Sequence, residues 1–134
     1  MNFIDTNVLL YAAASAEDEE AKRLQALTLL ARGGYATSGQ VHAEFFVKAT
    51  SRLRPPLHQE VALDWLARLR LFPVVPVTGA IVAAGAAIAA RFQISYWDGA
   101  IIAAAHEIGA ETLYTEDLNN GQRYGSVRVV NPFV

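Results

Sequence analysis

The hydrophobic and polar positions along the chain divide it into short apolar runs and longer amphipathic segments. Short apolar runs bounded by turn residues predict buried strands, and apolar residues at helical spacing predict helices. The predicted strands are 2–4, 35–37, 74–77, 112–114 and 127–130. The predicted helices are 5–14, 16–32, 40–53, 57–71, 80–92 and 95–108. Because strands and helices alternate, we expect a three-layer α/β/α sandwich over a mostly parallel sheet of about five strands. We see no linker or repeat, and we expect one domain, residues 1–134.

Two of these helices carry specific expectations about burial. In the 57–71 helix, Leu57, Val61, Trp65, Leu66 and Leu69 form an apolar face that should point inward. The stretch 71–90 has no charged residue over 20 positions, which is the length of a membrane span. Two prolines and Gly79 interrupt it, so we expect a short buried strand followed by a slim, buried helix and no membrane segment.

Composition and charge limit the function classes. The chain has 134 residues, 53% hydrophobic and 18% charged, which predicts a well-buried core and no disorder. It has no cysteine, which excludes disulfides, thiolate nucleophiles and Cys-ligated zinc. Its three histidines lack zinc-motif spacing, so any metal would be held by oxygen. A net charge of −2 argues against nucleic-acid binding by bulk electrostatics but leaves a metal-dependent nuclease open. The first residues lack the features of a signal peptide, and we expect a cytoplasmic protein.

Four carboxylates occur at equivalent places, where an apolar strand gives way to polar turn or helix residues. Asp5 and Asp117 follow strands, Glu44 lies about two turns into a helix, and Asp98 lies in a first helical turn. The carboxyl ends of parallel strands meet at one edge of a sheet, so all four should face one crevice. Clustered carboxylates repel one another unless a cation compensates them, and Mg²⁺ or Mn²⁺ prefers carboxylate and water ligands. Such a site suits phosphodiester hydrolysis.

Each acid also has an ordinary structural explanation. Asp5 and Asp98 could cap the helices that they open, and Asp117 could be a turn residue. Glu44 could form a solvated i,i+4 pair with Lys48. Four independent coincidences at equivalent positions would be needed, so we favour the metal site.

Neighbouring polar residues fall into two groups. Thr6, Asn7 and Thr115 stand beside the acids and could orient them through hydrogen bonds, although each could equally cap or end an element. Lys48, Arg52 and Arg54 extend from Glu44 towards Pro55-Pro56 and are candidates for contacting RNA phosphates. Glu116 should point away from Asp117 along a strand, and His106 is expected to interact with its helix terminus rather than to act as a base.

Together these residues resemble the motifs of a known nuclease family. Phe3-Ile4-Asp5-Thr6-Asn7-Val8-Leu9-Leu10-Tyr11 resembles the first motif of PIN-domain ribonucleases, and the segment 38–46 around Glu44 resembles the second. The segments 95–105 around Asp98 and 114–121 around Asp117, followed by Val130-Asn131-Pro132-Phe133, resemble the remaining motifs of VapC-type toxins. Gly99 is smaller than the residue expected after the third acid, which should loosen the local packing.

The resemblance covers the whole chain and carries several implications. It implies a Mg²⁺- or Mn²⁺-dependent endoribonuclease that is the toxin of a type II toxin–antitoxin pair. It implies that Asp5, Glu44, Asp98 and Asp117 are the metal-site acids, that the chain forms a homodimer, and that a VapB-like antitoxin inhibits it. The groove between the first helices and the 57–71 helix is our candidate for the antitoxin surface. The alternative is a PIN-like module that binds RNA or protein without cutting, in which the acids serve as caps.

Overall fold

A single twisted sheet organises the molecule. The structure, a computed structural model, describes residues 1–134 and contains six strands in the order β3-β2-β1-β4-β6-β5. The strands are β1 (Asn2–Ile4), β2 (Tyr35–Ser38), β3 (Val74–Val75), β4 (Thr112–Tyr114), β5 (Arg123–Tyr124) and β6 (Val127–Val130). All pairings are parallel except that of β5 with β6. The predicted mostly parallel sheet is confirmed, with one strand more than predicted. The additional strand, β5, was not predicted because it is only two residues long and carries no apolar run.

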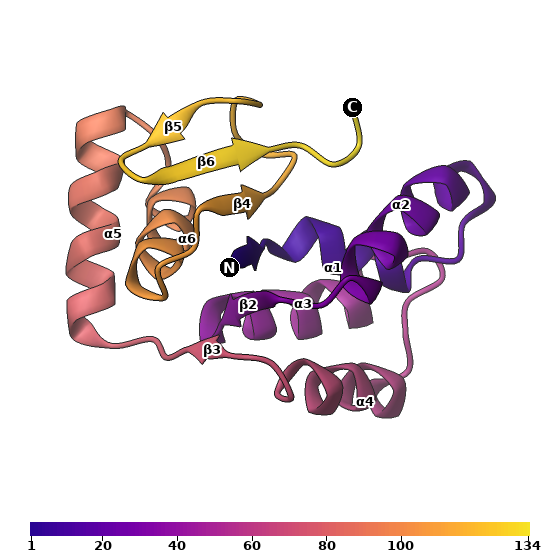
Figure 1. The fold of residues 1–134 in the computed structure, drawn as a ribbon. Coiled ribbons are helices and arrows are strands. Elements are labelled where there is room, and N and C mark those ends of the chain that lie inside the picture. Colours follow the sequence, from indigo (N-terminus) through magenta and orange to yellow (C-terminus); the bar gives the residue numbers. More distant parts are fainter.

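Six helices connect and cover the strands (Figure 1). They are α1 (Thr6–Ala13), α2 (Glu20–Ala31), α3 (Gly39–Ser51), α4 (Gln59–Leu69), α5 (Gly79–Phe92) and α6 (Tyr96–Glu107), with a 3₁₀ turn η1 (Glu17–Glu19) before α2. The hydroxyls of Ser38 and Ser95 accept hydrogen bonds from the backbone at Val41 and Asp98, so both serines cap helices as predicted. Gly33 and Gly109 have positive φ after the ends of α2 and α6, which allows the sharp stops.

The direction of the crossovers produces the three layers. The connections from β1 to β2 and from β2 to β3 run one way along the sheet, and the connection from β3 to β4 runs back. Because parallel crossovers are right-handed, the first two place α1–α4 on one face, and the third places α5 and α6 on the other. The chain reverses its direction along the sheet between β1 and β4, which is the point where open α/β sheets bind ligands.

Helix α5 differs from its prediction. Its only buried residue is Gly85, and Figure 1 shows it at the outer edge of the molecule, beside α6. The expected slim, buried helix is therefore wrong: seven consecutive residues of α6, from Gly99 to Ala105, are buried instead. Charge-free alanine is compatible with either environment, so the absence of charge did not indicate burial. The inward face of α4 also needs correction, because Val61 is exposed.

The crossing of α5 and α6 depends on glycine. A methyl group at Gly85 would lie 2.7 Å from the Cα of Ala100, and a methyl group at Gly99 would collide with the carbonyl oxygen of Gly85. The expectation that Gly99 loosens the packing is wrong, because its missing side chain is what lets the two backbones come so close. Asp98 precedes this contact by one residue, so the crossing fixes the start of the helix that carries the third acid.

No single helix is long and apolar enough to cross a membrane. Helices α5 and α6 taken together reach the length and hydropathy of a span, but they are bent by 117° at their junction.

Candidate functional site

All four predicted acids line one pocket at the carboxyl edge of the sheet. The pocket has a volume of about 350 Å³, and its lining includes Asp5, Glu44, Asp98 and Asp117. Asp5 directly follows β1, and Asp117 lies just beyond β4, on the two sides of the point where the chain reverses. Helices α3 and α6 contribute the other two acids. Four segments far apart in the sequence thus deliver one carboxylate each to the same space.

Asp5 combines a capping interaction with a place in the pocket. Its Oδ1 accepts a hydrogen bond of 2.7 Å from the backbone N–H of Thr6, as a helix cap does. Its Oδ2 accepts a second hydrogen bond, of 2.8 Å, from the hydroxyl of Thr115. The capping explanation therefore describes one oxygen of Asp5 only, and the second oxygen belongs to the hydrogen-bond network of the site.

Thr115 connects three of the polar residues. Its hydroxyl donates to Asp5 and accepts hydrogen bonds from the Asn7 amide at 3.0 Å and from the Asp117 backbone N–H at 3.1 Å. It is fully buried, so these partners satisfy it without solvent. The Asn7 amide also donates to Asp117 Oδ2 at 3.1 Å, and the Thr6 hydroxyl donates to Glu44 Oε2 at 3.1 Å. The structure therefore places all three predicted orienting residues in contact with acids.

Gln40 and Trp97 also belong to the pocket, although sequence reasoning did not select them. The Gln40 side-chain amide donates to Glu44 Oε1 at 2.9 Å and to the Trp97 carbonyl at 3.3 Å. Gln40 precedes Glu44 by four positions, so the helical i,i+4 spacing was the signal that could have identified it. Trp97 lines the pocket beside Asp98. Its sequence neighbourhood gave no signal beyond its adjacency to an acid.

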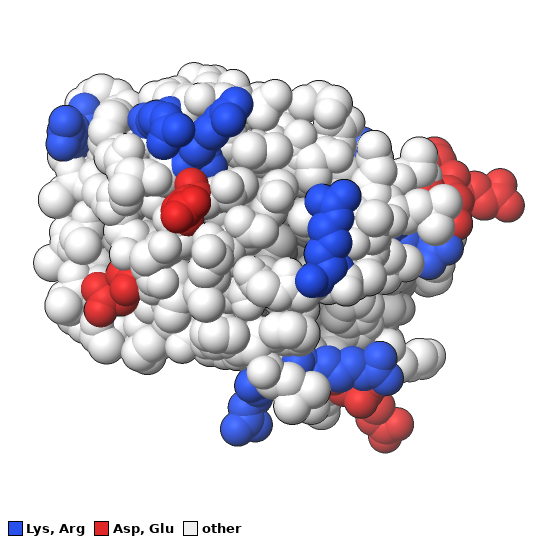
Figure 2. Space-filling model, in the orientation of Figure 1, with Lys and Arg blue, Asp and Glu red and all other residues white.

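Of the three basic residues predicted to contact RNA, one lies at the pocket. Lys48 lines it and approaches Glu44 Oε2 at 3.8 Å. The Arg54 guanidinium instead donates to the backbone carbonyls of Ser51 and Leu53, and neither Arg54 nor Arg52 lines the pocket. On the face drawn in Figure 2, positive and negative groups are scattered over a mostly uncharged surface. A broad basic surface is not visible there.

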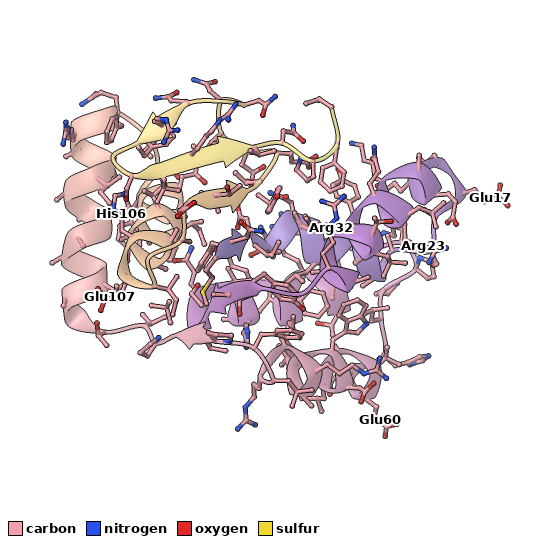
Figure 3. All side chains as sticks on the ribbon, in the orientation of Figure 1. Glu17, Arg23, Arg32, Glu60, His106 and Glu107 are labelled. Carbon is pink, nitrogen blue, oxygen red and sulfur yellow. The ribbon has the colours of Figure 1, made fainter.

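Glu116 and His106, for which the sequence predicts no catalytic role, lie outside the pocket. Glu116 accepts a hydrogen bond of 2.9 Å from the Tyr11 hydroxyl, and its Oε2 lies 3.8 Å from Lys22 Nζ. His106 lies on α6 (Figure 3), where its Nε2 is 2.8 Å from the backbone carbonyl of Tyr124. His106 thus links α6 to β5 and is not positioned as a base for the pocket.

The electrostatics of the pocket disfavour negative charge. Burial raises the pKa of Asp5 from 3.8 to about 7, although hydrogen bonds from Thr115 and Thr6 oppose the increase, and the charges of Asp117 and Glu44 raise it further. Burial also raises the pKa of Asp98, and the same two acids add to the effect. A buried carboxylate among other carboxylates destabilises the fold at neutral pH unless a cation or proton compensates it.

The donor set fits a hard, oxygen-liganded cation. No cysteine or histidine lines the pocket, and the available donors are carboxylates with the amide of Gln40 beside them. No three His, Asp or Glu side chains converge closely enough to hold an ion by themselves. Mg²⁺ typically takes only one or two protein carboxylates and keeps several waters, so four separated acids suit direct and water-mediated ligation together.

Comparison with known proteins identifies the fold. A sequence model of the PIN domain matches residues 3–123. A chain of a Klebsiella pneumoniae toxin–antitoxin complex is 22% identical and has a TM-score of 0.71 over 98% of each chain. Mycobacterium tuberculosis VapC20, described as a sarcin–ricin-loop-cleaving toxin, is 18% identical with a TM-score of 0.70 over 87% of this chain and 92% of its own.

A third solved structure extends the same comparison. VapBC2 from Rickettsia felis, bound to a promoter DNA fragment, contains a chain that is 18% identical with a TM-score of 0.63 over 96% of each chain. No curated protein matches the chain by sequence. At these identities the solved structures establish a common fold, and the sequence model covers most of the chain. The chain therefore belongs to the PIN domain family.

Proposed function

We propose that this protein is a Mg²⁺- or Mn²⁺-dependent endoribonuclease that acts in the cytoplasm as the toxin of a type II toxin–antitoxin pair. The observation that carries the proposal is the convergence of Asp5, Glu44, Asp98 and Asp117 on one pocket. Burial in this pocket raises the pKa of Asp5 to about 7, which disfavours its charged form at neutral pH. Residues with strongly shifted pKa values are concentrated at functional sites. Membership of the PIN family and the fold shared with toxins support this assignment.

The residues of the pocket have different proposed roles in hydrolysis. A bound Mg²⁺ or Mn²⁺ supplies charge neutralisation at the phosphate and acidification of a water molecule. Asp5, Glu44 and Asp98 are the candidate direct ligands, and Asp117 would complete the site directly or through water. Thr115 and Thr6 hold Asp5 and Glu44 in fixed orientations, and Asn7 does the same for Asp117. Lys48, the only cationic side chain lining the pocket, faces the approaching phosphate.

Cleavage of total cellular RNA tests this proposal. Purified protein should produce discrete fragments in Mg²⁺ or Mn²⁺ and none in EDTA, and Asp98→Asn should reduce the rate at least about 100-fold. Asp64→Asn is the matched control, because Asp64 is an exposed acid on α4 that pairs with Arg68 and does not line the pocket. Intact RNA with folded, antitoxin-free protein would favour the alternative, a module that binds RNA or protein without cutting.

A groove between α2 and α4 is the proposed antitoxin surface. It has a volume of about 550 Å³ and is lined mainly by apolar side chains, among them Leu27, Leu30, Trp65 and Phe72. Solved structures with this fold include toxin–antitoxin complexes, and an apolar segment of an antitoxin fits such a groove. Leu30→Asp should abolish co-purification with the antitoxin, whereas Leu71→Asp, on an exposed residue outside the groove, should not. The proposed homodimer is tested by sedimentation of the free protein.

A further inference from the structure

Trp97 is a large aromatic side chain left open to solvent beside the acids. It is 61% exposed, and it immediately precedes Asp98 in the first turn of α6. Tryptophan is mostly buried in folded proteins, so its exposure next to a charged pocket needs a reason. The hydrolytic chemistry assigned above makes no use of its ring.

Trp97 also lines a second cleft next to the acid pocket. This cleft has a volume of about 410 Å³, within the roughly 300–1,000 Å³ range of ligand-binding clefts. Gln40, Glu44, Lys48 and Trp97 line both spaces, so the two lie side by side. The remaining walls of the cleft are uncharged: Gly39, Ala43, Val47, Val77 and Tyr96. Charged groups therefore occur only at its shared edge.

The protein braces Trp97 without covering it. The Tyr96 ring packs against it edge-on, with centroids 5.0 Å apart and planes at 74°. The Gln40 side-chain amide donates a hydrogen bond of 3.3 Å to the backbone carbonyl of Trp97, and it also donates to Glu44. Gln40 thus links the backbone at Trp97 to a candidate metal-site acid, while most of the Trp97 surface stays accessible.

We propose that this cleft binds an unpaired nucleobase of the RNA, stacked on Trp97, next to the phosphate that lies at the acids. The inference rests on the proposed nuclease function and adds to it a base-binding subsite at Trp97. A ribose tethers each base to its phosphate, so a strand whose phosphate reaches the acids must place a neighbouring base close by. The uncharged wall of the cleft suits the base, and the acid pocket, with Lys48 and a cation held by the acids, would suit the phosphate. A base inside a duplex is paired and stacked and could not enter.

A double-mutant cycle between protein and RNA tests the subsite. The probe is a fluorescent ten-nucleotide single-stranded RNA and a series in which one nucleotide at a time lacks its base. Binding is measured by anisotropy in Ca²⁺, with a gel confirming that the RNA stays intact. For the wild-type protein, removal of the base at one position should weaken binding about 5- to 150-fold, the equivalent of one base–aromatic stack. In Trp97→Ala the same removal should have no further effect, and Trp97→Phe should restore part of the coupling.

Controls separate this subsite from its alternatives. Leu71→Ala removes an exposed apolar side chain elsewhere and should leave binding unchanged. Trp65→Phe leaves Trp97 as the sole tryptophan, and RNA should then quench its fluorescence. Equal base dependence in wild type and Trp97→Ala would overturn the proposal. So would conversion of a dimer to a monomer by Trp97→Ala without loss of RNA affinity, because a second copy would then cover the cleft. Since the binding assay requires no cleavage, a failed nuclease and a failed subsite give different results.

Discussion

At the scale of single residues, the polar network behind Asp5 is the most informative feature. Thr115 is fully buried and holds Asp5, Asn7 and the backbone of Asp117 through one hydroxyl. Removal of that hydroxyl would deprive the buried Oδ2 of Asp5 and the backbone N–H of Asp117 of this partner, while the Asn7 amide would keep its hydrogen bond to Asp117 Oδ2. Partners that orient metal-binding ligands typically contribute a factor of about 10–100 to metal affinity or activity.

Thr115→Val tests this network because it keeps the shape of the side chain and deletes its hydroxyl. We expect the free energy of unfolding to fall by about 1–3 kcal/mol, since buried polar groups lose partners. Mn²⁺ affinity should fall about 10- to 100-fold. Urea unfolding and calorimetric titration measure the two effects. Thr115→Ser retains the hydroxyl and should stay close to wild type; a valine variant that binds Mn²⁺ normally would show that the hydroxyl does not position Asp5.

At the scale of elements, the tight crossing of α5 on α6 positions the third acid. Gly85 and Gly99 allow backbone-to-backbone contact, and Asp98 stands next to it. Burial of α5 side chains contributes little to stability, because every residue of the helix except Gly85 is at most partly buried. The stability of this region therefore depends on the close crossing more than on a set of large apolar side chains.

Gly99→Ala should destabilise the protein although alanine favours helices. The added methyl group would lie 3.0 Å from the backbone nitrogen of Ala89 and would collide with the Gly85 carbonyl. Overpacking of this kind costs about 1–3 kcal/mol, which exceeds the gain in helix propensity of up to about 1 kcal/mol. Thermal unfolding measures the difference. Gly79→Ala adds a methyl group at a helical glycine with open space around it and should not destabilise; equal melting temperatures for both variants would disprove the packing argument.

At the scale of the whole molecule, the sheet forces four carboxylates into one space, which links stability to pH and metal. The folded protein keeps a proton on Asp5 up to about pH 7, whereas the unfolded chain releases it near 3.8. Between these values the folded state binds more protons than the unfolded state, so stability decreases as the pH rises. A bound cation increases stability as the pH rises, because it binds the deprotonated form of Asp5.

The free energy of unfolding without metal should therefore fall between about pH 4 and pH 7, by at most about 4 kcal/mol from Asp5. Mn²⁺ at 100 times its Kd stabilises by about 2.7 kcal/mol, and because Kd rises as the carboxylates protonate, a fixed Mn²⁺ concentration should stabilise more at pH 8 than at pH 5.5. Urea titrations over this pH range measure both trends. Asp5→Asn should flatten the slope without metal, and equal stabilisation by Mn²⁺ at both pH values would contradict the linkage.

The sequence alone determined the features that depend on local chemistry. Short apolar runs, serine caps and glycine stops specified five of the six strands and all six helices to within a few residues, because these signals act over neighbouring positions. Acids placed where strands end also determined which carboxylates face the crevice, because parallel strands present their carboxyl ends at a common edge. The two-residue strand β5 was missed because its pairing with β6 depends on a turn rather than on its own composition.

Contacts between side chains on distant segments depend instead on how the elements pack in three dimensions. The exposure of α5, the contact between Gly85 and Gly99, and the bonds of Thr115 to three partners all depend on how elements pack. Arg54 lies in the bend after α3, where its guanidinium donates to backbone carbonyls instead of lining the pocket. Gln40 and Trp97 line the pocket because the rotation of α3 and α6 sets where residues on these helices point. Local patterns fix the elements and their order. The burial of Asp5 and its raised pKa arise only when the other elements pack around the end of β1.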